Sequence, residues 1–348
     1  MRGWVVASTG KGKDMKRGKI LVGILWVLCF HLSLTSGVKA QDKIVVGYDG
    51  TAGFQGPIWA AHDLGLLDRH GLSAELVMIP GGARGMQALL SGSTQFAQGS
   101  AIAPISVMVK GGDLIIVAVA LNKFPFSLVA QKEIRKPTDL VGKKIGIVNF
   151  GGSNELAVLL ALKEWNIAPH SVTLLPAGDA ATRLIGMTTK VLDATVLAPP
   201  ETLKAAEFGL NILGHMSEMQ AYFPQTVISV RRSLLGKNRD MVKRFVRAYS
   251  EAIYQFRTNR EKAIGVYAKR LRQRDAKVVE ETYNYFAGKF SFPPRLDRDG
   301  MLNALSLVSE RSPGVKSEAQ PEQFVDESVL DELEKEGFFT KVQGGSGK

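Results

Sequence analysis

Six short turns, each between a strand-like and a helix-like stretch, contain the polar residues and glycines that could bind a small molecule. Free backbone N–H groups at a helix start attract anions, and in an open parallel sheet ligands bind beyond the carboxyl ends of the strands. Every α/β protein also needs such junctions for structural reasons, so one turn alone decides nothing. The turns lie at 48–55, 81–84, 99–101, 149–153, 177–179 and 198–201.

The turn at 149–153 shows why these segments suit a ligand. Gly151 and Gly152 allow a tight turn, and Ser153 is expected to cap the next helix. If two lobes face each other, six helix starts converge on one cleft. That arrangement favours a small ligand with an anionic or strongly polar head.

Sequence patterns typical of enzymes are missing. The five histidines are not spaced like metal ligands, and the chain has no H-E-x-x-H, G-x-S-x-G or G-x-x-x-x-G-K-[ST] motif. The only cysteine, Cys29, lies in the leader segment, so thiol chemistry and disulfides are excluded from the mature protein. Catalysis has no positive support, and we predict no catalytic residue, no metal and no cofactor.

The first forty residues read as a cleaved secretory signal peptide, with Met15 as the candidate start. A basic stretch at 15–19 precedes an apolar run at 20–34, and small residues before Gln41 suit a signal peptidase. The alternative is a transmembrane anchor, but the run is shorter than a span usually needs. With no cysteine at the cleavage point, we expect an unlipidated protein of the Gram-negative periplasm.

Charge gives no sign of a nucleic-acid partner. Seven basic residues and one acidic residue in 1–40 account for +6 of the chain's +11, which leaves +5 on the mature part. That balance is only mildly basic. Acidic residues interrupt the basic stretch at 239–274, so a solvated helix face is preferred there.

The elements that position the turns form two similar series, which predict two Rossmann-like α/β lobes with parallel-rich sheets and a helical C-terminal part. The C-terminal part should include a helix at 239–259, a loop at 310–323, a last helix from Asp326 stopped by Gly337, and a flexible tail at 341–348. The expected strands lie at 43–48, 72–79, 94–100, 114–121, 143–150, 172–177 and 192–198. The expected helices lie at 56–67, 83–92, 103–112, 153–165, 180–190 and 200–209.

Three stretches carry a family resemblance: "PIWAAHDLGLLDRHGLSAELVMIPGGARGMQALLSGSTQFA", "KPTDLVGKKIGIVNFGGSNE" and "FVDESVLDELEKEGF". Together they resemble periplasmic binding proteins of ABC importers for nitrate, sulfonate, taurine and thiamine-pyrimidine-like ligands. The likeness covers roughly 43–339. No single motif is specific, and the order and spacing of the motifs support the assignment.

The resemblance implies the two-crossover hinge of the type II periplasmic-binding-protein fold, in which two lobes close on a ligand. The crossovers are expected near 121–126 and 221–226. Lobe I would comprise 41–121 plus 223–340, and lobe II would comprise 122–222. It also implies a small-molecule ligand, an ABC permease with its ATPase as partner, and a monomer.

Candidate ligand-binding residues come from positions that match the family's ligand loops. Phe54, Phe126 or Tyr222 could stack on a planar part of the ligand. Arg84 suits a sulfonate or carboxylate, or else is a solvated arginine one turn into a helix. Asp49 and Glu201 instead favour a ligand with an amine or a protonated ring nitrogen. The candidates are Tyr48, Asp49, Phe54, Gln55, Gly82, Arg84, Ser100, Asn122, Asn149, Gly151, Ser153, Asn154, Glu201 and Tyr222.

The sequence thus predicts the solute-binding component of an ABC importer, which captures a sulfonate-, taurine-, nitrate- or pyrimidine-like molecule by hinge closure. A pyrimidine-precursor-type enzyme on the same fold is one alternative. A ligand-sensing subunit of a signalling receptor is another.

Overall fold

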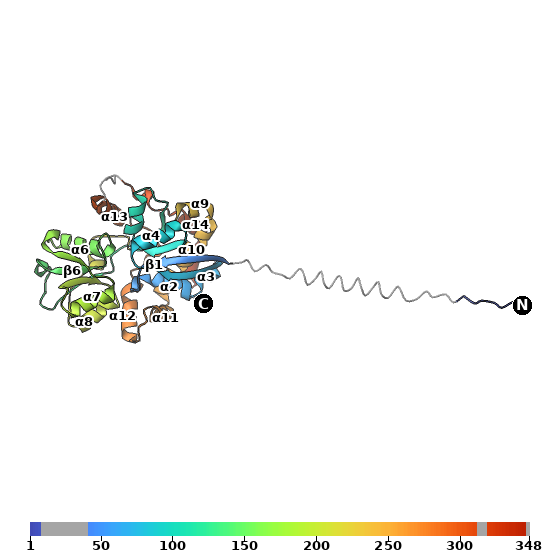
Figure 1. Cartoon of the computed structure of the whole chain (residues 1–348), viewed down its shortest axis with the longest axis horizontal. Coiled ribbons are helices and arrows are strands. Elements are labelled where there is room, and N and C mark those ends of the chain that lie inside the picture. The colour runs from blue at the N-terminus through green and yellow to red at the C-terminus, as the bar shows by residue number, and fades with distance from the viewer. Residues whose placement is uncertain (8–40, 312–318, 346–348) are drawn as a thin grey trace. The chain divides into compact units, whose positions relative to one another are not determined.

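A computed structural model of the chain describes residues 1–7, 41–311 and 319–345 (Figure 1). The apolar run and the cleavage site of the predicted signal peptide lie outside these residues. In the ranges described, no helix combines the length and the apolar character that a bilayer span requires.

The first of two five-stranded sheets has the strand order β2-β1-β3-β10-β4. β1 pairs in parallel with β2 and β3, whereas β10 runs antiparallel to β3 and β4. We call this sheet and the helices around it lobe I. Its strands are β1 (Asp42–Tyr48), β2 (Leu72–Met78), β3 (Phe96–Gly99), β4 (Ile115–Leu121) and β10 (Thr226–Val230).

The second sheet has the order β7-β6-β8-β5-β9 and the same plan. β6 pairs in parallel with β7 and β8, and β5 runs antiparallel to β8 and β9. We call this sheet and its helices lobe II, which contains the green and yellow elements of Figure 1. Its strands are β5 (Ser127–Ala130), β6 (Lys144–Ile147), β7 (Thr173–Pro176), β8 (Ala194–Leu197) and β9 (Asn211–His215).

The predicted fold class, α/β with two parallel-rich sheets, is confirmed, but three strands were missed. β5, β9 and β10 have only four or five residues each and no long apolar run. Their strand character depends on pairing with strands distant in sequence, which local patterns do not report. β10 in the first sheet and β5 in the second sheet are the strands that run antiparallel to both of their neighbours.

The helices of the two α/β series lie between the strands as predicted, with one break. The helix expected at 56–67 divides at Gly65, whose φ of 66° is left-handed, into α2 and α3. The series comprises α2 (Gly56–Asp63), α3 (Leu66–Arg69), α4 (Gly82–Ser91), α5 (Ile102–Met108), α6 (Ser153–Glu164), α7 (Ala180–Thr188) and α8 (Glu201–Glu207).

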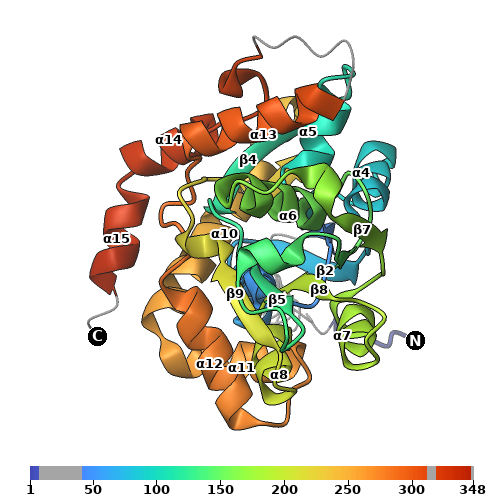
Figure 2. The ribbon, with the colours of Figure 1, turned by 90° about the vertical axis from the view of Figure 1, so that its left-hand side faces the viewer.

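The C-terminal part is helical, and its long helix α10 (Arg239–Thr258) packs against α2 and α3. There Phe245 stacks on Phe96 of β3 with ring centroids 3.8 Å apart. In Figure 2, α11 and α12 lie at the bottom and α13 at the top. The remaining helices are α9 (Arg232–Lys237), α11 (Arg260–Arg270), α12 (Ala276–Ala287), α13 (Arg298–Arg311), α14 (Ser328–Lys335) and α15 (Phe338–Gly344).

The chain end differs from the prediction. Gly337, with a φ of 68°, separates α14 from the next helix, as expected of a helix stop. That next helix, α15, runs to Gly344, so the tail predicted from 341 is helical over its first half. The apolar pair Phe338 and Phe339 explains this helix, because Phe339 is buried and packs on Phe292.

Two chain segments, 122–126 and 216–225, connect the two sheets. Phe124 of the first segment stacks on Phe223 of the second with ring centroids 4.2 Å apart. Both rings are buried. The two connections therefore share one aromatic contact between the lobes.

Candidate ligand-binding site

The turn after β1 places Asp49 at the carboxyl edge of the first sheet. Gln55 Nε2 donates a hydrogen bond to Asp49 Oδ1 at 2.7 Å, and the backbone N–H of Ser100 donates to the same carboxyl group. Burial raises the pKa of the Asp49 carboxyl, against the opposing effect of these hydrogen bonds. Among the described residues, no lysine or arginine forms an ion pair with it. Asp49 is thus a half-buried acceptor without a cationic partner.

A chain of hydrogen bonds holds Asp49 from the interior of lobe I. Tyr249 Oη donates to Gln98 Oε1 at 2.6 Å, and Gln98 Nε2 donates to Gln55 Oε1 at 2.5 Å. Gln55, Gln98 and Tyr249 are all buried. Every hydrogen bond in this series is donated in the direction of the carboxyl group, so the amides of Gln98 and Gln55 are each held in one orientation. We call Tyr249, Gln98, Gln55 and Asp49 the amide relay.

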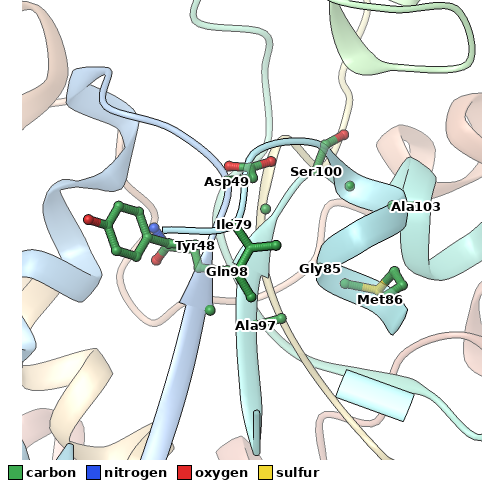
Figure 3. A pocket seen from close by; sticks show the side chains of 12 residues that line it. Tyr48, Asp49, Ile79, Gly85, Met86, Ala97, Gln98, Ser100 and Ala103 are labelled. Atoms are coloured by element: carbon green, nitrogen blue, oxygen red, sulfur yellow. The ribbon is translucent and has the colours of Figure 1, made fainter. Parts of the chain in front are cut away.

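A hollow opens beside Asp49, between the ends of β1 and β3 and the first turns of α4 and α5 (Figure 3). Its volume is about 270 Å³ including the open mouth. Of the predicted residues, those that line it are Tyr48, Asp49, Gly82 and Ser100.

Ser100 adds a second polar group to the hollow. Ser100 follows β3 and lines the hollow together with Asp49 (Figure 3). The Ser100 Oγ atom is buried and has no hydrogen-bond partner in the described part of the chain. Buried polar atoms are usually paired, so an unpaired hydroxyl on a hollow is a candidate contact for a ligand.

The matching corner of the second sheet surrounds the start of α6. The prediction that Ser153 caps this helix was wrong: the N-cap is Gly152, without any side-chain hydrogen bond. Instead, the N–H of Gly151 donates to Glu155 Oε2 at 2.5 Å. A Cβ at Gly152 would lie 2.5 Å from Asn149 Oδ1, so a larger residue there would displace the Asn149 side chain.

Asn154 lies in the first turn of α6 and is buried, with 6% of its surface exposed. Its Oδ1 accepts a hydrogen bond of 2.7 Å from Nη1 of Arg183 on α7. Arg183 was not among the residues predicted from the sequence. It is also buried.

The lobes touch at one edge of this region. The N–H of Gly53, in the first turn of lobe I, donates to the Pro199 carbonyl of lobe II at 3.1 Å. Glu201 begins α8 two residues after Pro199. Burial raises the pKa of the Glu201 carboxyl. The first and last of the six predicted turns are therefore brought together.

Asn122 is hydrogen-bonded within the protein. Its Nδ2 donates to Ser291 Oγ at 3.1 Å and to the Arg295 carbonyl at 2.9 Å, and its Oδ1 accepts from the Asp297 N–H at 3.0 Å. The amide is fully used in joining the first connection to the segment at 291–297. Asn122 therefore stays a prediction as a ligand contact, and its amide already has partners within the protein.

Three other predicted residues lie away from the hollow. Arg84 is exposed on α4 and does not line it, which matches the alternative of a solvated arginine. Phe54 packs edge-on against Phe126, with centroids 6.2 Å apart. Tyr222 is 42% exposed, and Lys123 Nζ lies 4.7 Å from its ring centroid.

Sequence reasoning missed the interior half of the site. Gln98 gives a weak signal as a polar residue inside a buried strand, and Arg183 gives one as a charged residue in an otherwise apolar helix segment. Tyr249 gives none, because an aromatic residue on the apolar face of a long helix reads as ordinary core.

Two α/β lobes joined by two connections, with the first turn of lobe I touching the last turn of lobe II, define a two-lobed fold. The chain belongs to the NMT1/THI5 like family, whose model matches residues 55–263. This confirms the family resemblance predicted from the sequence.

Curated relatives agree with this membership. A Brucella abortus (strain 2308) protein, named only as a binding protein, is 30% identical over 286 residues, covering 79% of this chain and 88% of the relative. The taurine-binding periplasmic protein of Escherichia coli (strain K12) is 30% identical over 176 residues, covering 49% of this chain and 53% of the relative.

Solved structures at low identity show the same fold. A Bordetella bronchiseptica RB50 protein superposes with a TM-score of 0.73 at 18% identity, covering 85% of this chain and 98% of that one. The alkanesulfonate-binding protein of Xanthomonas axonopodis pv. citri, bound to MOPS, gives 0.66 at 17%, covering 84% and 99%. A desulfurization enzyme gives 0.62 at 14%, covering 85% and 99%, so this fold also occurs in an enzyme.

Proposed function

We propose that this protein is the periplasmic solute-binding component of an ABC importer. It captures a small polar molecule between its lobes and presents the closed form to a permease and its ATPase. Family membership, the similarity to a periplasmic taurine-binding protein and the hollow beside Asp49 and Ser100 support this function. The signal peptide predicted at 1–40 supplies the export route, and we expect the mature protein to act as a monomer.

The ligand we propose is a small zwitterion of the taurine type, with an ammonium group on Asp49. The single observation that carries this choice is a half-buried carboxyl group, on a hollow, without a cation beside it. An ammonium group would pair with the Asp49 carboxylate and offset the desolvation cost of its charge. The anionic end of the ligand would face lobe II, near the start of α6, where a helix N-terminus favours negative charge.

Binding would work by conformational change and would break no bond. The connections at 122–126 and 216–225 act as the hinge, and ligand contacts with both lobes favour the closed population. The enzyme alternative has less support, because the amide relay contains no nucleophile with an adjacent base. A sensing role would use the same site and differ only in the partner.

Isothermal titration calorimetry on the chain from Gln41 tests the proposal. The panel is taurine, ethanesulfonate, nitrate and a 4-aminopyrimidine, and the variant is Asp49→Asn, which keeps the shape and removes the charge. A hydrogen bond to a charged group contributes about 1.5–3 kcal/mol, so we expect the variant to bind taurine roughly ten- to a hundredfold more weakly.

Ethanesulfonate is the matched control, because it lacks only the ammonium group. Its affinity should change far less than that of taurine in Asp49→Asn. Equal losses of affinity for taurine and ethanesulfonate would refute the proposed contact between the ammonium group and Asp49. A wild-type chain that binds no member of the panel would refute the proposed ligand class.

A further inference from the structure

Arg183 is a buried arginine that joins three corners of lobe II. Only 3% of the surface of Arg183 is exposed. Nη1 donates to Asn154 Oδ1 at 2.7 Å and to the Gly178 carbonyl at 3.1 Å, and Nη2 donates to the Val196 carbonyl at 3.1 Å. The first partner comes after β6, the second comes after β7, and the third lies in β8. One guanidinium group therefore fixes the carboxyl edge of three parallel strands relative to one another.

The charge of Arg183 has only neutral partners at contact distance. In the residues that the structure describes, its guanidinium forms no ion pair, and Asp179 and Glu201 act on it only from farther away. Its Nε atom is buried with no hydrogen-bond partner among the described residues. Burial lowers the pKa of this guanidinium to about 10. A buried cation in such a setting is unfavourable for stability alone, which points to a role in the site.

The geometry imposes one orientation on the Asn154 amide. The arginine has donors only, so the amide oxygen must face it and the amide Nδ2 must face away. Nδ2 donates to no described residue, yet it is not among the buried unpaired atoms, so it keeps access to solvent. Asn154 thus presents two free N–H donors at the start of α6, at the carboxyl edge of the sheet.

We propose that Arg183 is a positioning residue that holds Asn154 as a hydrogen-bond donor for an oxygen of the bound ligand. This assignment rests on the proposed function, because it takes the carboxyl edge of lobe II as one wall of the binding cleft. A sulfonate or carboxylate oxygen is the acceptor that such a donor fits. Arg183 supplies the orientation, and Asn154 makes the contact.

Asn154→Asp tests the assignment because it separates stability from binding. The new carboxylate would pair with Arg183, so the ligand-free chain from Gln41 should melt at higher temperature. An acid in the first turn of a helix is also favourable by itself. Ser153→Asp, one residue earlier and with no contact to Arg183, is therefore the matched control. We expect Asn154→Asp to melt at least about 2 °C above that control.

Taurine titration gives the second half of the test. Asn154→Asp offers a ligand oxygen only acceptors and negative charge, so taurine should bind at least about tenfold more weakly than to wild type. Greater stability with weaker binding is the result expected. A melting temperature no higher than that of Ser153→Asp overturns the pairing with Arg183, and an unchanged taurine affinity overturns the donor role.

Failure of the proposed function is distinguishable from failure of this inference. If the wild-type chain binds neither taurine nor ethanesulfonate, the proposed ligand class is wrong and the donor role falls with it. The melting comparison still decides whether Arg183 orients Asn154. A purely structural Arg183 would give the same rise in the melting temperature of Asn154→Asp and would leave the taurine affinity unchanged.

Discussion

Tyr249→Phe removes one hydroxyl group from the far end of the amide relay and leaves the ring in place. The Tyr249 ring stacks beside Phe245, with centroids 6.1 Å apart, and a phenylalanine retains that packing. The substitution removes the donor to Gln98 Oε1 at 2.6 Å. Both residues are buried, so we expect no water to replace the hydroxyl.

The free energy of unfolding should fall by about 1–3 kcal/mol, because a buried acceptor left without a donor keeps its full desolvation penalty. The loss also frees the Gln98 amide to rotate, which weakens the orientation of Gln55 and Asp49. Taurine affinity should therefore decrease in Tyr249→Phe. In an Asp49→Asn background the same substitution should cause no further loss of affinity, because the relay then has no charged group to orient.

Urea unfolding followed by tryptophan fluorescence measures the stability effect. The chain from Gln41 has one tryptophan in each lobe, Trp59 in α2 and Trp165 after α6. A Trp165→Phe background makes the signal specific to lobe I, where Trp59 is buried.

The control is Tyr254→Phe, on the same helix α10. Its hydroxyl donates to the Gln343 carbonyl at 3.2 Å at an exposed position, so the loss should stay within about 0.5 kcal/mol. Equal stability of Tyr249→Phe and Tyr254→Phe would refute the claim that the relay is a continuous buried hydrogen-bond chain.

Two further predictions concern residues outside the relay. Burial alone would raise the pKa of the Asp63 carboxyl, but hydrogen bonds from His62, Arg270 and Lys269 hold it well below its usual value. Because the folded-state pKa is depressed, the stabilisation is present above the unfolded pKa and is lost as the pH falls. Asp63→Asn should therefore lose about 1–3 kcal/mol in urea unfolding at neutral pH, and the difference should shrink on acidification; a pH-independent difference would contradict it. Arg84→Ala should change taurine affinity by less than about twofold in calorimetry, because Arg84 is exposed and outside the hollow, and a tenfold loss would restore it as a ligand contact.

The elements of the fold were predictable where one continuous stretch of sequence determines them. The run "LIIVAVAL" becomes β4, buried along its whole length, because a strand covered on both faces needs apolar residues throughout. β10 has only five residues, and its place between β3 and β4 depends on chain returning from lobe II. Antiparallel return strands of this kind have no local signature.

The site was predictable only at its surface. The turns after β1 and β6 gave Asp49 and Asn154 by position, but the residues that orient them come from distant elements. Tyr249 and Gln98 are 151 residues apart in sequence, and Arg183 and Asn154 are 29 apart. Asn122 shows the converse: a polar residue at the expected position is already fully hydrogen-bonded to a loop that the sequence did not place beside it.

In the ranges that the structure describes, each lobe contains a charged group without a partner of opposite charge, and the two groups have opposite signs. A single zwitterionic ligand could interact favourably with both lobes. Lobe I has a half-buried carboxyl group without a cation, and lobe II has a buried guanidinium whose direct partners are all neutral. Either group alone is unfavourable in the free protein. A short zwitterion that reaches both Asp49 and the Asn154 amide gains from each lobe only when the lobes come together. Ligand selectivity and lobe closure would then have the same cause. A molecule that lacks either charged end would leave the charged group of one lobe without a partner, and its binding would stabilise the closed form less.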